Sequence, residues 1–132
     1  MNIRSVLVGI AAFFGCSSCF SAGNPQKITP DQGMSLFTGS GPYILVDVRR
    51  PDEYEAAHIP GAILIPNETI TDSRPALLPD QNAVIVVYCR TGHRSGIAAK
   101  KLVKMGYTHI LDLGGIVDWP YKTVSGSKPG KF

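Results

Sequence analysis

Cysteine is scarce in this chain. There are 3 cysteines among 132 residues, and two of them, Cys16 and Cys19, lie near the N-terminus. The rest of the chain holds one thiol, Cys89, so an intrachain disulfide framework is excluded there. The 3 histidines are scattered without the spacing of a zinc site, and no metal is predicted. With 44% hydrophobic residues, the chain can still bury the core of one domain without such crosslinks.

Charge is also sparse. The charged residues make up 17% of the chain, the formal net charge is +3, and the lysines and arginines are spread along the sequence. A basic stripe of the kind that binds nucleic acid is absent, so nucleic acid is not expected as a partner. The mild positive charge leaves a small anion as a candidate ligand.

No apolar run reaches the ~20 residues that a membrane-spanning helix needs. The run at 6–15 follows Arg4 and leads into small residues at 16–23, a pattern typical of a secretory signal peptide. We therefore predict that residues 1–21 are a signal, cleaved before Ala22, and that the mature protein is exported without stable membrane insertion. An uncleaved anchor and a lipoprotein acylated at Cys16 are the alternatives.

Short apolar runs alternate with helical patterns along the rest of the chain. Four runs rich in Val, Ile and Leu lack polar alternation, which is typical of strands buried on both faces of a parallel sheet. These runs are 43–48, 62–65, 83–88 and 110–113. Favourable start residues predict helices at 30–37, 51–57 and 95–105. The sequence therefore predicts an α/β fold with a central parallel sheet, an unassigned stretch at 67–82 and a flexible tail at 125–132.

The residues that carry chemistry follow the strand predicted at 83–88. The segment from Cys89 to Arg94 leads from that strand into the next helix. In a parallel sheet such a junction lies at the carboxyl edge, where ligands bind. The N–H groups of the loop, the positive end of the helix, Arg90 and Arg94 all favour an anion and a cysteine thiolate. Cys89 is therefore predicted to be a nucleophile at neutral pH and not an inert buried thiol.

Three separated groups of residues resemble the motifs of the rhodanese-like sulfurtransferases. They are DVRRPDEY at 47–54 followed by HIPGA at 58–62, CRTGHRS at 89–95, and LGG at 113–115 followed by Trp119. The resemblance covers nearly the whole chain after the predicted signal and is strongest to the short, single-domain, exported rhodaneses of bacteria. It implies a rhodanese domain at 22–124, with a central parallel sheet of about five strands and helices on both faces.

The resemblance also implies an activity. A sulfane sulfur would pass from thiosulfate, or a related small anionic donor, to cyanide or a thiol through a persulfide on Cys89. The donor would be bound by the rest of the loop, which is Arg90, Thr91, Gly92, His93 and Arg94. No cofactor is required, and export from a bacterial cytoplasm would place the protein in the periplasm.

Residues outside the loop have supporting or structural interpretations. Asp47 ends a predicted strand beside the loop, where it could orient Arg90 or cap the following turn. Arg49 and Glu53 are spaced to pair across the start of a short helix. His58 precedes a turn and is predicted to be a buried hydrogen-bonding group.

Other chemistries share parts of this pattern. Phosphatases of the same fold place five residues between Cys and Arg, whereas four separate Cys89 from Arg94. A papain-like hydrolase would pair Cys89 with a histidine, but His93 lies inside the same tight loop. The third alternative is a rhodanese-fold module that binds without catalysis, which the basic neighbours of Cys89 disfavour.

Overall fold

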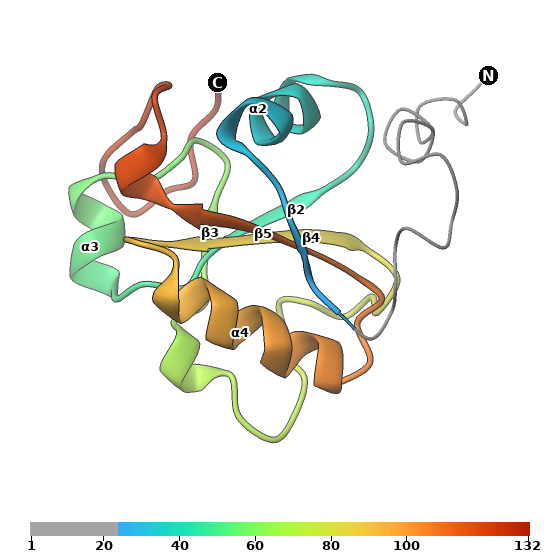
Figure 1. The fold of residues 1–132 in the computed structure, drawn as a ribbon. Coiled ribbons are helices and arrows are strands. Elements are labelled where there is room, and N and C mark those ends of the chain that lie inside the picture. Colours follow the sequence, from blue (N-terminus) through green and yellow to red (C-terminus); the bar gives the residue numbers. More distant parts are fainter. Residues whose placement is uncertain (1–23) are drawn as a thin grey trace.

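The centre of the molecule is a five-stranded sheet in which every pairing is parallel. The computed structural model describes residues 24–132 (Figure 1), and the signal peptide predicted at 1–21 lies outside them. The strands are β1 (Gln26–Lys27), β2 (Ile44–Asp47), β3 (Ile63–Leu64), β4 (Val84–Cys89) and β5 (His109–Gly115), in the order β1-β5-β4-β2-β3. The predicted α/β fold with a parallel sheet is confirmed.

The edge strand β1 has no counterpart in the sequence-based assignment. It is two residues long and pairs Gln26 with Leu111 and Lys27 with Asp112 of β5. Neither of its residues is apolar, because an edge strand this short leaves its side chains partly in solvent. A pattern of apolar residues therefore could not reveal it.

Within residues 24–132, three α-helices and two 3₁₀ turns lie between or after the strands. They are α2 (Pro30–Thr38), α3 (Pro51–Ala56), α4 (His93–Lys104), η2 (Asn67–Thr69) and η3 (Ile116–Asp118). Helix α2 begins with a capping box, in which Thr29 Oγ1 accepts from Gln32 N and Gln32 Oε1 accepts from Thr29 N. Helix α4 starts two residues before the predicted Ser95, because Gly92 with φ +105° serves as its N-cap.

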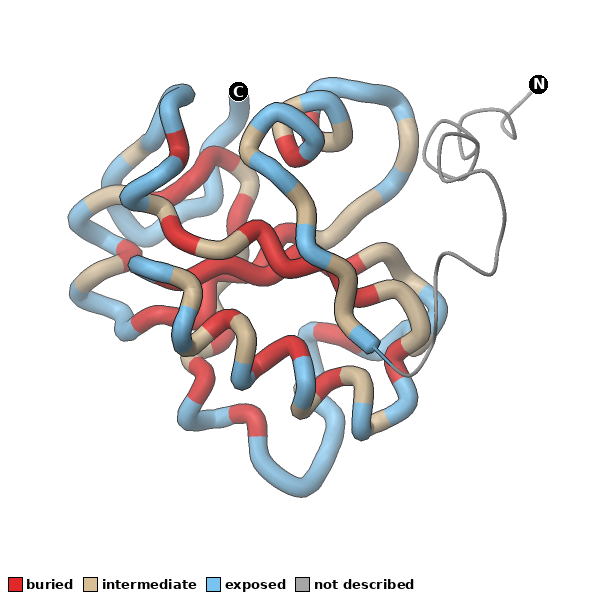
Figure 2. Tube along the Cα trace, in the orientation of Figure 1, coloured by how far each residue is buried: buried red, intermediate tan, exposed pale blue. Residues whose placement is uncertain are grey.

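Helices cover both faces of the sheet and enclose two cores. Figure 2 shows that buried residues are concentrated along the central strands. On one face, Ala98, Ala99 and Leu102 of α4 pack against the sheet. On the other face the core is formed by residues from α2, α3, the strands and the segment around residues 116–119, among them Phe37, Tyr54 and Trp119. The prediction of helices on both faces is therefore confirmed.

The chain reverses its winding direction between β2 and β4. Helix α3 follows β2 and packs on one face, whereas α4 follows β4 and packs on the opposite face (Figure 1). Strands β2 and β4 are neighbours in the sheet, and their carboxyl ends lie side by side at Asp47 and Tyr88. An α/β sheet has its ligand crevice at such a reversal point.

The C-terminal residues 125–132, expected to be a flexible tail, make specific contacts with the domain. His58 is fully buried, and its Nε2 lies 2.9 Å from the carbonyl oxygen of Lys128. Its Nδ1 lies 2.8 Å from the Tyr54 carbonyl, which fits the prediction that His58 is a buried hydrogen-bonding group. The ring of Phe132 stacks on Phe37, with centroids 6.1 Å apart. The prediction of a flexible tail rested on its polar composition. Composition does not reveal that groups of this segment contact residues elsewhere in the chain.

Candidate functional site

The site is built around the thiol loop, which we define as residues 89–94. Cys89 is the last residue of β4, and its side chain is 1% exposed. The backbone N–H of Gly92 donates a hydrogen bond to Cys89 Sγ over 3.0 Å. Gly92 adopts φ +105°, a conformation that side chains disfavour, and this sharp turn brings its N–H back to the sulfur. A cysteine that acted only as a small core hydrophobe would not need such a donor.

Two glycines at the end of β5 form a floor beneath the loop. A Cβ atom on Gly115 would lie 2.5 Å from the carbonyl oxygen of Arg90 and 2.7 Å from the Cα of Thr91. A Cβ on Gly92 would in turn lie 3.7 Å from the Cα of Gly114. The loop therefore rests directly on the β5 backbone, and this contact sets its position relative to the sheet.

A buried carboxylate fixes the start of α4 to the same floor. Asp112, 4% exposed, accepts hydrogen bonds from Ser95 Oγ at 2.8 Å and from Gly114 N at 3.0 Å. Ser95 Oγ also lies 3.1 Å from the carbonyl oxygen of Gly92. Ser95 and Asp112 together tie the glycine turn of the thiol loop to β5. The sequence analysis missed Asp112, because a single acidic residue within a buried strand has no distinctive spacing.

Arg94 is engaged by a carboxylate from another helix. Its Nη1 and Nη2 donate to the two oxygens of Glu53 on α3, at 2.8 and 3.0 Å. These hydrogen bonds lower the pKa of Glu53 to about 2 and raise the pKa of Arg94. The predicted pairing of Arg49 with Glu53 was wrong, because the fold brings Arg94 to Glu53 from 41 positions away in the sequence.

Asp47 pairs with Arg49, the arginine that was predicted to pair with Glu53. Its carboxylate accepts from the backbone N of Arg49 at 2.9 Å and from Arg49 Nη2 at 2.7 Å. It also accepts from the hydroxyl of Tyr88 at 2.9 Å, and burial together with this negative charge raises the pKa of Tyr88. Asp47 therefore caps the turn after β2 and pairs with Arg49, and among the contacts of residues 24–132 none joins it to Arg90.

The remaining loop residues point to solvent. Arg90, Thr91 and His93 are exposed, whereas Gly92 and Arg94 are partly buried. Within residues 24–132, Arg90 has no ion-pair partner, and the hydrogen bond to Cys89 Sγ comes from Gly92 and not from His93. This geometry does not support a papain-like cysteine and histidine pair.

The described part of the chain contains no group of three His, Cys, Asp or Glu residues that could hold a metal ion. None of the helices within residues 24–132 is long and apolar enough to cross a membrane.

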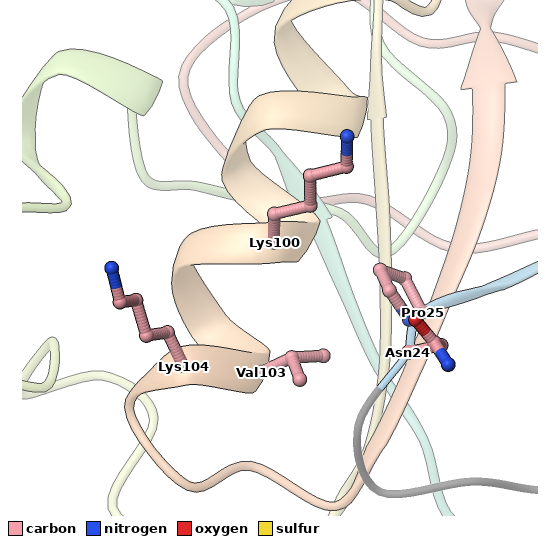
Figure 3. A pocket seen from close by; sticks show the side chains of 5 residues that line it. All are labelled: Asn24, Pro25, Lys100, Val103 and Lys104. Atoms are coloured by element: carbon pink, nitrogen blue, oxygen red, sulfur yellow. The ribbon is translucent and has the colours of Figure 1, made fainter.

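A separate hollow, lined by Asn24, Pro25, Lys100, Val103 and Lys104, lies towards the C-terminal end of α4 (Figure 3). The side chains of Lys100 and Lys104 point in different directions (Figure 3). The hollow lies along the later turns of α4, whereas the thiol loop ends in the first turn of this helix.

Cys89 therefore lies at the N-terminus of a helix and at the ligand-binding edge of a parallel sheet, with a backbone N–H on its sulfur, and these features define an α/β protein with a candidate thiol site. The sequence model of the rhodanese-like domain family matches residues 29–121, and the chain belongs to this family.

Individual relatives support this assignment. The thiosulfate sulfurtransferase PspE of Escherichia coli (strain K12) is 40% identical over 81 residues, which cover 61% of this chain and 78% of that protein. A solved structure described as a rhodanese with anions from E. coli is 38% identical, with a TM-score of 0.59, and covers 64% of this chain and 99% of that chain. The adenylyltransferase and sulfurtransferase UBA4 of Candida albicans is 34% identical over 100 residues, which are 70% of this chain and 23% of UBA4. The family relationship therefore supports a sulfurtransferase.

Proposed function

We propose that this protein transfers a sulfane sulfur from thiosulfate, or a similar anionic donor, to a small nucleophile through a persulfide on Cys89. The observation that carries the proposal is the 3.0 Å hydrogen bond from Gly92 N to Cys89 Sγ at the start of α4. An N–H donor and the positive end of a helix both stabilise a sulfur anion. The same groups would stabilise the thiolate before transfer and the persulfide after it.

In the first step, the Cys89 thiolate attacks the outer sulfur of thiosulfate. A bond forms between Sγ and that sulfur, the original S–S bond breaks, and its electron pair leaves with sulfite. The negative charge of the thiolate passes to the terminal sulfur of the persulfide. Sulfite is a stable anion, so the step needs no general acid, and the described residues place no acid beside Cys89.

In the second step, cyanide or a thiolate attacks the terminal sulfur of the persulfide. The bond between that sulfur and Sγ breaks, the Cys89 thiolate is regenerated, and thiocyanate or a new persulfide leaves. Each step converts one sulfur anion into another inside the same loop: the thiolate into the persulfide, and then the persulfide into the thiolate. The loop therefore has to stabilise one negative charge throughout and does not need to move a proton.

Loop length favours sulfur over phosphate. Four residues lie between Cys89 and Arg94, and the loop is packed tightly against Gly114 and Gly115. A phosphoryl group carries three oxygens that need donors around them, and a larger ring of N–H groups would have to surround it. Glu53 also occupies both terminal nitrogens of Arg94, which a phosphatase would use for the phosphate oxygens.

The test is mass spectrometry of the purified protein before and after incubation with thiosulfate. We expect the mass of one sulfur atom to be added at Cys89, and the addition to disappear with cyanide. A Cys89→Ser variant should take no sulfur, because a neutral hydroxyl with no adjacent base cannot replace a thiolate. Cysteine-dependent hydrolysis of an aryl phosphate, with no sulfur added by thiosulfate, would instead establish the phosphatase alternative.

We also propose that the protein works in the periplasm, on the basis of the N-terminal sequence alone. Fractionation of a bacterial cell that expresses the full chain should recover a mature protein that starts near Ala22. A soluble cytoplasmic protein that keeps residues 1–21 would contradict the export proposal without affecting the sulfur chemistry.

A further inference from the structure

A groove beside the thiol loop has no role in the steps described so far. It lies between α3 and η3, which are neighbours at one side of the molecule (Figure 1), and it has a volume of about 360 Å³. Its walls include Ala56, Ala57, Ile116, Val117, Thr123 and Arg90. We call this hollow the α3–η3 groove. Arg90 is both a wall of the groove and the second residue of the thiol loop, so the groove adjoins the loop there.

The groove combines an apolar wall with one available cation. Val117 is 59% exposed, although a branched apolar side chain gains by being covered. Arg49 and Glu53 also line the groove, but Asp47 already pairs with Arg49 and Arg94 with Glu53. Within residues 24–132, Arg90 has no such partner. The groove therefore offers apolar contact together with one unneutralised guanidinium.

The groove is fixed to the loop by the backbone. The N–H of Val117 donates to the carbonyl oxygen of Arg90 over 3.2 Å. A molecule held against Val117 is thus held in a constant position relative to the residue that follows Cys89. Such constant positioning is what raises the effective concentration of a second reactant.

We propose that the α3–η3 groove binds the sulfur acceptor, and that this acceptor is a small thiol with a carboxylate and an apolar or amide portion. The inference rests on the proposed function, because it places the acceptor beside a persulfide on Cys89. The carboxylate pairs with Arg90, the rest of the molecule covers Val117, and the thiolate attacks the terminal sulfur. Cyanide is too small to need the groove and reaches the persulfide without it.

The experiment uses the protein loaded with thiosulfate and then freed from it, so that loading and discharge are measured separately. Discharge is followed by mass spectrometry with three acceptors: cyanide, N-acetylcysteine and the neutral N-acetylcysteine amide. Val117→Trp fills the groove, and we expect the rate with N-acetylcysteine to fall about tenfold relative to the rate with cyanide. Leu77→Trp is the matched control, because Leu77 is also 59% exposed and does not line the groove, and it should keep that ratio.

The charge requirement has its own variant. Arg90→Gln should lower the discharge rate with N-acetylcysteine about fivefold more than the rate with its amide, because the two acceptors differ mainly in the carboxylate. Thr123→Trp fills the same groove from another wall and replaces Val117→Trp if that variant does not fold. An unchanged ratio of N-acetylcysteine to cyanide discharge in a folded, groove-filled variant would overturn the proposal. A wild-type protein that gains no sulfur from thiosulfate would refute the proposed function itself, and the acceptor groove with it.

Discussion

Replacing Gly115 by alanine tests whether the glycine floor positions the thiol loop. A Cβ atom there would lie 2.5 Å from the Arg90 carbonyl oxygen, and ordinary contact starts at 3.4 Å, so the loop backbone must retreat by about 0.9 Å. The backbone of Gly115 has φ −108° and ψ 139°, which any residue adopts, so the effect is steric and not conformational. Forcing one extra carbon into such a contact costs about 1–3 kcal/mol of folding free energy.

The same displacement should impair sulfur loading far more than stability. The hydrogen bond from Gly92 N to Cys89 Sγ depends on the loop position, and an error of about 1 Å in a reacting geometry costs roughly 100-fold in rate. The assays are urea unfolding and sulfite release from thiosulfate at a protein concentration where the variant is folded. Gly41→Ala is the control, because its Cβ meets nothing within 4 Å. A folded Gly115→Ala protein that loads sulfur at the wild-type rate would show that the floor does not position the thiol.

Three further outcomes follow from the same contacts. The pKa of Glu53 is lowered from 4.5 to about 2, so its ion pair stabilises the folded state above pH 4.5, and this stabilisation is lost as the pH falls towards 2. In urea unfolding, the free energy of unfolding of Glu53→Gln should therefore depend less on pH between pH 4.5 and 2 than that of the wild type. An identical pH dependence would contradict the pairing. Arg94→Ala should lower the free energy of unfolding in urea by about 1–3 kcal/mol, because Glu53 loses its bidentate partner. Arg90 has no ion pair within residues 24–132, so Arg90→Ala should unfold like the wild type but release sulfite more slowly from thiosulfate. Gly96→Ala should raise the free energy of unfolding by about 0.5–1 kcal/mol, since its Cβ meets Asp112 Oδ2 at an ordinary 3.9 Å inside α4; a lower urea midpoint would show that this helix turn has less room than its contacts indicate.

The sequence predicted the parts of the fold that depend on local pattern. The strands β2, β4 and β5 are apolar without alternation because helices cover both of their faces, and α2 begins where Thr29 and Gln32 can form a capping box. It did not predict β1, whose two residues pair with β5 without an apolar signal. The contacts of the C-terminal residues were missed because the groups that hold them, such as His58, lie far away in the sequence.

In the candidate site, too, some features were predictable from local sequence patterns and others were not. Cys89, Gly92 and the start of α4 form one continuous segment, so strand, turn and helix signals were enough to place them together. The pairing of charges was not predictable, because the choice between Arg49 and Arg94 as the partner of Glu53 depends on how α3 and α4 meet across the sheet edge. Local spacing favoured the nearer arginine, and tertiary packing selected the more distant one.

That choice of partner changes which groups are expected to attract an anion to the thiol loop. Arg49 and Arg94 pair with buried or largely buried carboxylates, so their positive charges are largely cancelled for an approaching donor. Arg50 lies against Asp52 in an exposed pair, which is weaker. The uncancelled positive charge comes from Arg90 and from backbone N–H groups at the start of α4, of which Gly92 N already points at Sγ. Backbone dipoles are fixed by the fold and do not titrate, so they can hold a sulfur anion without reorganisation at the moment of transfer. A single exposed arginine, Arg90, can then bind a donor or an acceptor carboxylate and still release the product, because one exposed ion pair is weak.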